Sequence, residues 1–118
     1  MKRHSEPFMF ADTTPRDPVG DGLARQLFGF DESILMARVD FEAGAIGEIH
    51  THEHSQVSYV ESGEFDVIID GVEKRLGPGD SFYIAPNLAH GAVCRKSGVL
   101  IDVFSPVRED FLAEGINE

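Results

Sequence analysis

Turn residues at short intervals place the strongest constraint on how this chain can fold. The 118 residues include 12 glycines and six prolines, and these separate short apolar segments along most of the sequence. Glycine reaches positive φ at no steric cost and proline interrupts regular hydrogen bonding, so both mark turns. Short strands that recur about every 8–12 residues are typical of a sandwich or a barrel. The spacing predicts an all-β protein, and the length predicts a single domain.

Alternation of apolar and polar residues locates the individual strands. In residues 34–41, the side chains of Ala37, Val39 and Phe41 fall on one face of an extended chain. The same pattern predicts further strands over residues 57–60, 64–69, 81–84, 91–94 and 99–104. Turns are expected between them at residues 61–63, 70–71 and 77–80.

The two ends of the chain differ from this pattern. Residues 1–22 contain three prolines and two glycines, so we interpret them as an arm that precedes the domain of residues 23–118. Within the arm, residues 8–10 could form a short strand against a neighbouring subunit. Near the C-terminus, Pro106 is expected to begin a short helix that ends near Gly115.

The charge balance excludes several classes of protein. Ten basic residues stand against 21 acidic ones, which gives a formal net charge of −11. Binding to nucleic acid or to anionic lipid requires clustered cations, so neither partner is expected. No apolar run approaches the roughly 18 residues of a membrane span, and residues 8–11 are too short for a signal peptide core. We therefore expect a cytoplasmic protein. With Cys94 as its single cysteine, it can form no intrachain disulfide and no cysteine-based metal cage.

The histidines carry the most specific chemistry in the sequence, and four of the five lie between positions 50 and 90. His50 and His52 would point to the same face of an extended segment. Gln56 follows four residues later, and His90 belongs to a distant strand. Three imidazole nitrogens and one amide oxygen could hold a divalent ion such as Zn, Ni, Mn or Fe, without selecting among them. The alternative is a set of unrelated surface or core histidines.

Glycines at fixed distances from these residues favour the metal site. Gly44 precedes His50 by six residues, and Gly63 follows Gln56 by seven. Downstream, Gly79 precedes His90 in a Gly-Asp…Ala-Pro-Asn-x-x-His run. A glycine by itself indicates only a turn. The fixed sequence distances between these glycines and the histidines are harder to explain by the need for turns alone.

This spacing resembles the two motifs of the cupin superfamily. The first motif is Gly, five residues, His-x-His, three or four residues, Glu, six residues and Gly. The sequence matches it at Gly44, His50, His52, Gln56 and Gly63, with Gln in place of Glu. The resemblance implies a jelly-roll-type β-barrel of two antiparallel sheets, with His50, His52 and Gln56 among the metal ligands.

The second cupin motif is matched less completely. Gly79 and His90 stand where it requires them, but Ala85, Asn87 and Cys94 replace its Pro, Gly and Asn. The resemblance implies that His90 completes the metal site. His54 falls outside both motifs, so we interpret it as an exposed residue or as a neighbour of the ligands.

A narrower resemblance covers residues 8–112. The segments 52–60, 90–94 and 102–112 are similar to those of the KdgF-type pectin-degradation cupins. In that family Gln is expected at the fourth ligand position. The resemblance implies a sugar acid as substrate: 4,5-unsaturated monouronates from pectin or alginate would be converted to linear ketonised sugars. That reaction is a ring opening followed by tautomerisation, with no redox step.

Three residues near the C-terminus suit this chemistry. Asp102 shares a strand face with apolar Leu100 and Phe104, and a buried carboxyl group requires a partner or a function. Asp102 could move a proton, and Arg108 could bind the substrate carboxylate through a bidentate contact. Phe104 could pack against the sugar ring. The alternatives are an ion pair of Asp102 or Arg108 with a neighbouring residue, and a purely structural role for Phe104.

Two other functions remain open at this point. One is a metal-dependent cupin dioxygenase, and the other is a sugar-binding cupin without catalysis. In each case we expect a homodimer, with the arm or an edge strand at the interface, because an exposed edge would otherwise pair without control.

Overall fold

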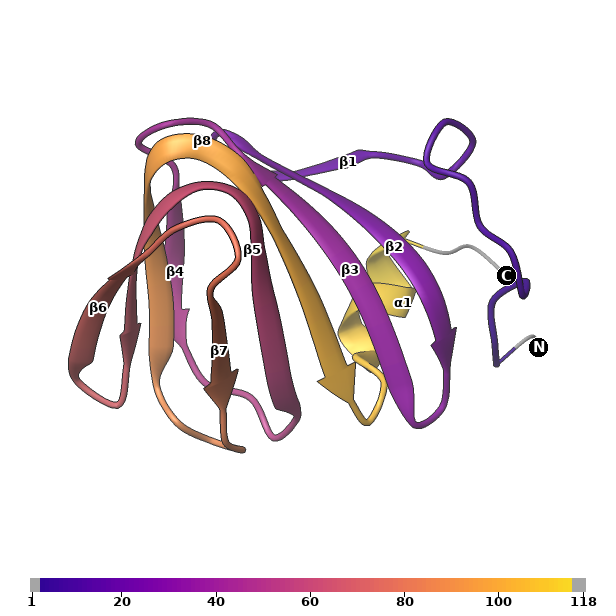
Figure 1. The fold of residues 1–118 in the computed structure, drawn as a ribbon. Helices are drawn as coiled ribbons and strands as arrows, with labels where there is room; N and C mark the ends of the chain where they lie inside the picture. The colour runs from indigo at the N-terminus through magenta and orange to yellow at the C-terminus, as the bar shows by residue number, and fades with distance from the viewer. Residues whose placement is uncertain (1–2, 116–118) are drawn as a thin grey trace.

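The computed structural model describes residues 3–115, which fold into strands and one short helix (Figure 1). The elements of this part of the chain are β1 (Asp17–Gly20), β2 (Leu23–Asp31), β3 (Ile34–Phe41), β4 (Ile46–His50), β5 (Ser55–Ile69), β6 (Val72–Leu76), β7 (Ser81–Ile84), β8 (His90–Ser105) and α1 (Glu109–Gly115). The all-β fold with a short C-terminal helix is therefore confirmed. No helix within these residues is long and apolar enough to cross a membrane.

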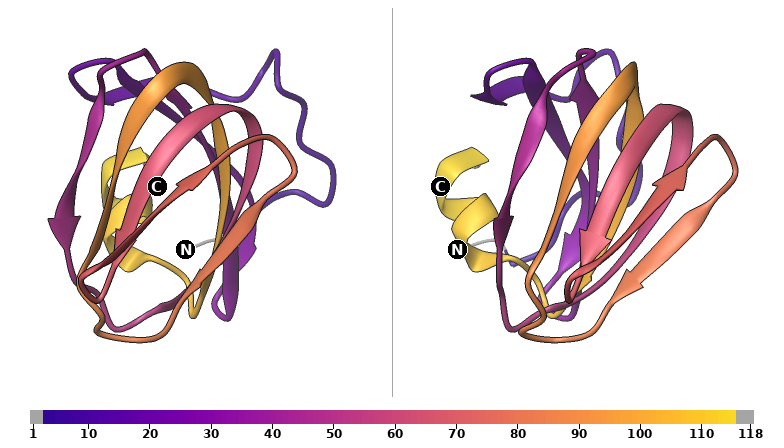
Figure 2. Two further views of the ribbon diagram at one scale, coloured as in Figure 1. Left: turned by 60° about the vertical axis from the view of Figure 1, so that its left-hand side comes forward. Right: turned by 90° about the vertical axis from the view of Figure 1, so that its left-hand side faces the viewer.

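The strands form two antiparallel layers that are joined into one sheet. One layer contains β1, β2, β3 and β7, and the other contains β4 and β6. The long strands β5 and β8 pair with each other and run through both layers, so the hydrogen bonding is continuous from one layer to the other. Figures 1 and 2 show how these two strands arch over and wrap the sheet into a flattened barrel.

Two glycines allow β5 and β8 to bend at the same point. Gly63 has a φ of +86°, and a Cβ atom on Gly98 would lie only 2.1 Å from the carbonyl oxygen of Ser62. A residue with a side chain would separate the two strands here. The expected turn at residues 61–63 is therefore wrong, because β5 continues through it with an irregular register against β8. Residues 91–94 and 99–104 likewise form one strand instead of two.

The apolar side chains gather in two clusters inside the barrel. The first surrounds the edge-to-face pair Phe41 and Phe65, whose ring centroids lie 5.0 Å apart. It includes Cys94, whose thiol pKa is raised by burial, so this cysteine packs as an apolar residue. The second cluster contains Leu35 and Phe104, and α1 packs against it. Phe104 also faces the histidines, so this cluster supports the site.

The arm is partly integrated into the sheet. Residues 17–20 form β1, which pairs with β2, a strand that the sequence pattern did not locate. Residues 8–10 are irregular within the single chain, so a strand formed there against a neighbouring subunit stays a prediction. The side chains of Phe8 and Phe10 are 80% and 64% exposed.

Candidate metal centre and active site

Three histidines from separate parts of the chain meet at one end of the barrel. His50 ends β4 and His90 begins β8, and the two are direct partners in the antiparallel pairing. His52 lies in the loop that follows β4. Each of the three offers one ring nitrogen, and these nitrogens all lie within 4.8 Å of one another. The structure therefore brings together the His-x-His pair and the distant histidine of the motif.

Backbone carbonyls hold the three rings in a common orientation. The Nδ1 atoms of His50, His52 and His90 lie 2.8, 3.0 and 2.9 Å from the carbonyl oxygens of Glu48, His54 and Leu88. A carbonyl oxygen only accepts, so each Nδ1 carries the proton and donates it. The Nε2 atom of each ring is then left with a free lone pair. This is the tautomer that a metal ligand needs.

Gln56 places an oxygen at the same point. Its side chain comes from β5 and is buried, and Oε1 lies 3.0 Å from Nε2 of His52. Both this oxygen and the unprotonated Nε2 atom are acceptors without a hydrogen. The contact is therefore favourable only when a cation or a proton interacts with both atoms. The fourth residue of the predicted set therefore reaches the histidine cluster.

Burial also suits these rings to metal binding. Desolvation lowers the pKa of both His52 and His90, so the neutral imidazole is favoured at neutral pH. The Nε2 atom of His90 is buried and has no hydrogen-bond partner. An unsatisfied buried nitrogen is costly unless a ligand completes it. The donor set therefore fits a divalent metal ion.

His54 is placed differently from the other three. It does not belong to the group of converging nitrogens, although its ring lies 5.5 Å from that of His52. Its backbone carbonyl accepts the Nδ1 hydrogen of His52. His54 therefore acts on the cluster through its backbone.

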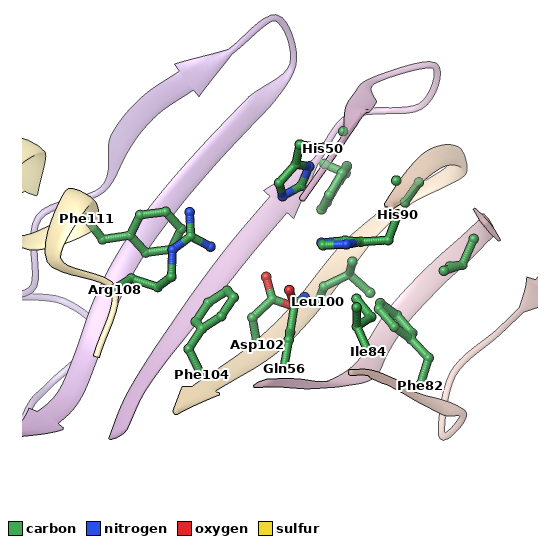
Figure 3. Close-up of a pocket in the computed structure, with 15 residues that line it drawn as sticks. His50, Gln56, Phe82, Ile84, His90, Leu100, Asp102, Phe104, Arg108 and Phe111 are labelled. Atoms are coloured by element: carbon green, nitrogen blue, oxygen red, sulfur yellow. The ribbon is translucent and has the colours of Figure 1, made fainter. Parts of the chain in front are cut away.

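A pocket of about 200 Å³ opens beside the histidines (Figure 3). Apolar side chains such as Ile84 and Leu100 form much of its wall. Its polar and aromatic lining includes His50, Gln56, His90, Asp102, Phe104 and Arg108. All three residues expected to take part in the chemistry thus face the same space as the histidines.

Asp102 is the ionisable group most changed by this environment. Desolvation raises the pKa of its carboxyl group from 3.8 to about 6, against the opposing effects of a hydrogen bond from Ser58 and the charge of Arg108. The group is thus half-protonated near pH 6, and roughly a tenth of it still carries the proton at pH 7. This is the range in which a carboxyl group can both accept and donate a proton.

Arg108 is held at the edge of the pocket by contacts on two sides. Its Nε and Nη2 atoms donate to the two carboxylate oxygens of Asp110 at 3.0 and 2.8 Å, and this ion pair lowers the pKa of Asp110. Its guanidinium carbon lies 4.9 Å from the ring centre of Phe104 and 4.0 Å from that of Phe111. The ion pair with a neighbouring acid, considered as an alternative, is therefore present.

The sequence analysis missed three residues of this region. Ser58 donates a hydrogen bond of 2.6 Å to Oδ1 of Asp102. The guanidinium carbon of Arg25, from β2, lies 3.9 Å from the ring centre of Phe111, a ring that Arg108 also contacts. Alternation along β5 could have placed Ser58 on the inward face, beside Gln56. No local signal predicts that Arg25 and Phe111 meet.

The barrel and its histidine cluster define a cupin, and residues 37–104 match the cupin domain family. The chain is 41% identical to the pectin degradation protein KdgF of Dickeya dadantii (strain 3937) over 107 residues, which cover 89% of this chain and 97% of that protein.

Two solved structures are also similar to this chain. The crystal structure of an RmlC-like cupin from Shewanella frigidimarina is 50% identical, with a TM-score of 0.91 over 93% of this chain and 99% of that one. KdgF from Halomonas sp. is 34% identical, with a TM-score of 0.87 over 92% of this chain and 100% of that one. The chain therefore belongs to the KdgF-type cupins.

The raised pKa of Asp102 leads to a prediction about stability. The folded protein holds this proton more tightly than the unfolded chain does, so Asp102 favours folding below about pH 4 and loses that contribution as the pH rises through about 6. The change corresponds to roughly 3 kcal/mol. In metal-free protein, Asp102→Asn should therefore gain stability relative to wild type between pH 4 and pH 7, as measured by urea unfolding.

Asp66 offers a control of opposite sign. Hydrogen bonds from Arg75 and Arg95 lower the pKa of its carboxyl group. Asp66→Asn should therefore lose stability relative to wild type as the pH rises from acid values. If the difference between wild type and Asp102→Asn does not change with pH, the pKa of Asp102 is not raised.

Proposed function

We propose that the protein converts 4,5-unsaturated monouronates from pectin or alginate breakdown to linear ketonised sugars. The observation that carries this proposal is the placement of a carboxyl group of raised pKa between a histidine cluster and an arginine, in one pocket. Similarity to KdgF proteins supports the choice of substrate.

The ligands in this proposal are His50, His52, Gln56 and His90, which would hold one divalent ion. An ion with such neutral ligands supplies Lewis-acid chemistry, by which sugar oxygens are polarised and developing negative charge is stabilised. The donor set does not choose among Zn, Ni, Mn and Fe.

Arg108 binds the carboxylate of the substrate in this proposal. A guanidinium group has five N–H donors, and Asp110 uses those of Nε and one of Nη2. The remaining donors can face the pocket, which Arg108 lines. Asp110 orients the side chain, and the flanking ring of Phe104 limits its movement. In a protein of net charge −11, such a local cation is needed to hold an anionic sugar.

Asp102 moves the proton in this proposal. Its carboxylate accepts the proton of the anomeric hydroxyl as the bond from the anomeric carbon to the ring oxygen breaks, which leaves an aldehyde and an enolate. The protonated carboxyl group then donates that proton to C4 as the enolate becomes a ketone. The proton balance closes without an oxidant or a reductant. A pKa of about 6 allows both transfers.

Phe104 provides an apolar face next to these groups. Its ring is only 3% exposed, and it contacts the rings of His52 and Phe111 in edge-to-face geometry. In this proposal the ring packs against the sugar and helps to exclude water.

The test is an assay on a pure unsaturated monouronate. Its conjugated double bond absorbs in the ultraviolet and the ketonised product does not, so loss of absorbance reports conversion above the spontaneous rate. Metal-loaded wild-type protein should accelerate the loss, and chelation should abolish the acceleration. Oxygen uptake by the iron-loaded protein would instead indicate a dioxygenase. Binding of the sugar without acceleration would indicate a non-catalytic binding protein.

We also propose that the protein forms a homodimer. Met36, Val57 and Tyr83 are 41%, 51% and 61% exposed, and they belong to one row across β3, β8, β5 and β7 on the outside of the sheet. A two-fold interface packs a surface patch against the same patch of a second copy. Because the protein has a net charge of −11, an uncharged patch such as this one avoids repulsion between like charges at that interface. The exposed Phe8 and Phe10 of the arm would extend the contact.

Light scattering at micromolar concentration tests the dimer. Val57→Lys should shift the wild-type dimer to a monomer, whereas Val72→Lys, which is similarly exposed on β6 but outside the row, should not. A strictly monomeric wild type contradicts the proposal. The cytoplasmic location stays a prediction.

A further inference from the structure

We propose that Ser58 is a positioning residue that fixes which end of the Gln56 side-chain amide faces the three histidines. The inference rests on the metal centre of the proposed function, but not on the reaction. The two ends of a glutamine amide differ chemically, since the oxygen is a metal ligand and the NH₂ group is not. Some contact must therefore keep the oxygen turned towards the ion.

Ser58 occupies the position from which this can be done. Its side chain is completely buried, and it lies directly opposite Asp102 in the pairing of β5 with β8. Gln56 is two residues earlier on the same strand, so both side chains point to the interior. Figure 3 shows the side chains of Gln56 and Asp102 next to each other in the pocket.

The single hydroxyl hydrogen of Ser58 determines the direction of the hydrogen bonds. Oγ of Ser58 lies 2.6 Å from Oδ1 of Asp102. The ionised form of Asp102, which predominates above pH 6, only accepts, so in that form the hydrogen of Ser58 points to Asp102. The remaining lone pairs of Oγ can only accept. The group that faces them, at 2.9 Å, is Nε2 of Gln56, which donates.

The opposite end of the amide is fixed as a result. With Nε2 bonded to Ser58, Oε1 faces the histidines, 3.0 Å from Nε2 of His52. A rotation of the amide by half a turn would bring two oxygens, neither with a free hydrogen, together at Ser58. It would also direct an N–H group at the metal position. Ser58 opposes this rotation, and Asp102 does so through Ser58.

Cobalt binding tests the inference on the full-length protein. Co²⁺ serves as the probe, because its visible absorption reports the ligands that surround it and calorimetry gives its affinity. After removal of metal by chelation, Ser58→Ala should bind Co²⁺ about 10–100-fold more weakly than wild type, as expected for a residue that orients a ligand. Its absorption spectrum should also change. Ser62→Ala is the matched control, because this serine lies on the same strand and bonds to Glu61 at the surface.

The same substitution in a Gln56→Glu variant separates an orienting role of Ser58 from a merely structural one. In Gln56→Glu both ends of the side chain are oxygens, so no end needs to be selected. Adding Ser58→Ala to Gln56→Glu should therefore weaken Co²⁺ binding by less than about threefold. Thermal unfolding of each metal-free variant establishes that it is folded.

The possible outcomes are distinct. Unchanged affinity of Ser58→Ala, or the same loss in both backgrounds, overturns the inference, because Ser58 then gives only structural support. Absence of Co²⁺ binding by wild type overturns both the metal centre and the inference. Wild type that binds Co²⁺ but leaves the uronate unchanged contradicts the proposed reaction alone, and the comparison of affinities still decides the role of Ser58.

Discussion

Replacing His90 by alanine is expected to remove nearly all bound metal and, with it, any turnover. His90 is 4% exposed, and its Nε2 atom is buried without a partner while Nδ1 is bonded to the carbonyl of Leu88. The alanine variant removes one of the proposed ligands and leaves the other donors around an incomplete site. We expect metal affinity to fall by more than about 100-fold, beyond the loss typical of a residue that only supports a ligand. Metal content after dialysis, measured by elemental analysis, gives the result.

His4 provides the matched control for this substitution. It is the remaining histidine outside the 50–90 region, and its ring bonds locally to the carbonyl of Ser5 on the surface. His4→Ala should retain a full equivalent of metal. A double variant of His50 and His52 that also retains a full equivalent would show that the metal binds elsewhere.

Asp102→Asn is expected to give the second largest effect. The amide keeps the shape of the side chain and can still bond to Ser58, but it can neither accept nor donate the proton as a carboxyl group does. Turnover on the unsaturated monouronate should fall by about 10²–10⁴-fold, the usual contribution of a general acid or base. The Michaelis constant should change little, since binding does not depend on the proton.

Arg108→Ala should show the opposite division between the two kinetic constants. Loss of the guanidinium removes the partner of the substrate carboxylate, so the Michaelis constant should rise more than turnover falls. Arg95→Ala is a suitable control, because that arginine pairs with Asp66 outside the pocket. If Asp102→Asn keeps most of the wild-type rate, Asp102 does not transfer the proton. If Arg108→Ala changes turnover alone, Arg108 does not chiefly bind substrate.

The sequence determined the features that depend on neighbouring residues. Alternation predicted β3 and the inward face of β8 on which Leu100, Asp102 and Phe104 lie, and Asp70-Gly71 predicted the turn that joins β5 to β6. The spacing of glycines and histidines indicated the candidate ligands and the cupin resemblance. These features are local because side-chain direction in a strand and positive φ in a turn are set within a few residues.

Only the tertiary structure decided which distant groups meet. Residues 61–63 have the composition of a turn, yet they continue β5 because β8 supplies hydrogen-bond partners through the bend and Gly98 leaves room for the close approach. The pairing of β4 with β8 brings His90 beside His50, and that of β5 with β8 sets Ser58 against Asp102. Cross-strand register depends on the whole sheet, and the desolvation that raises the pKa of Asp102 depends on everything packed around it. Neither is encoded in any short segment of the chain.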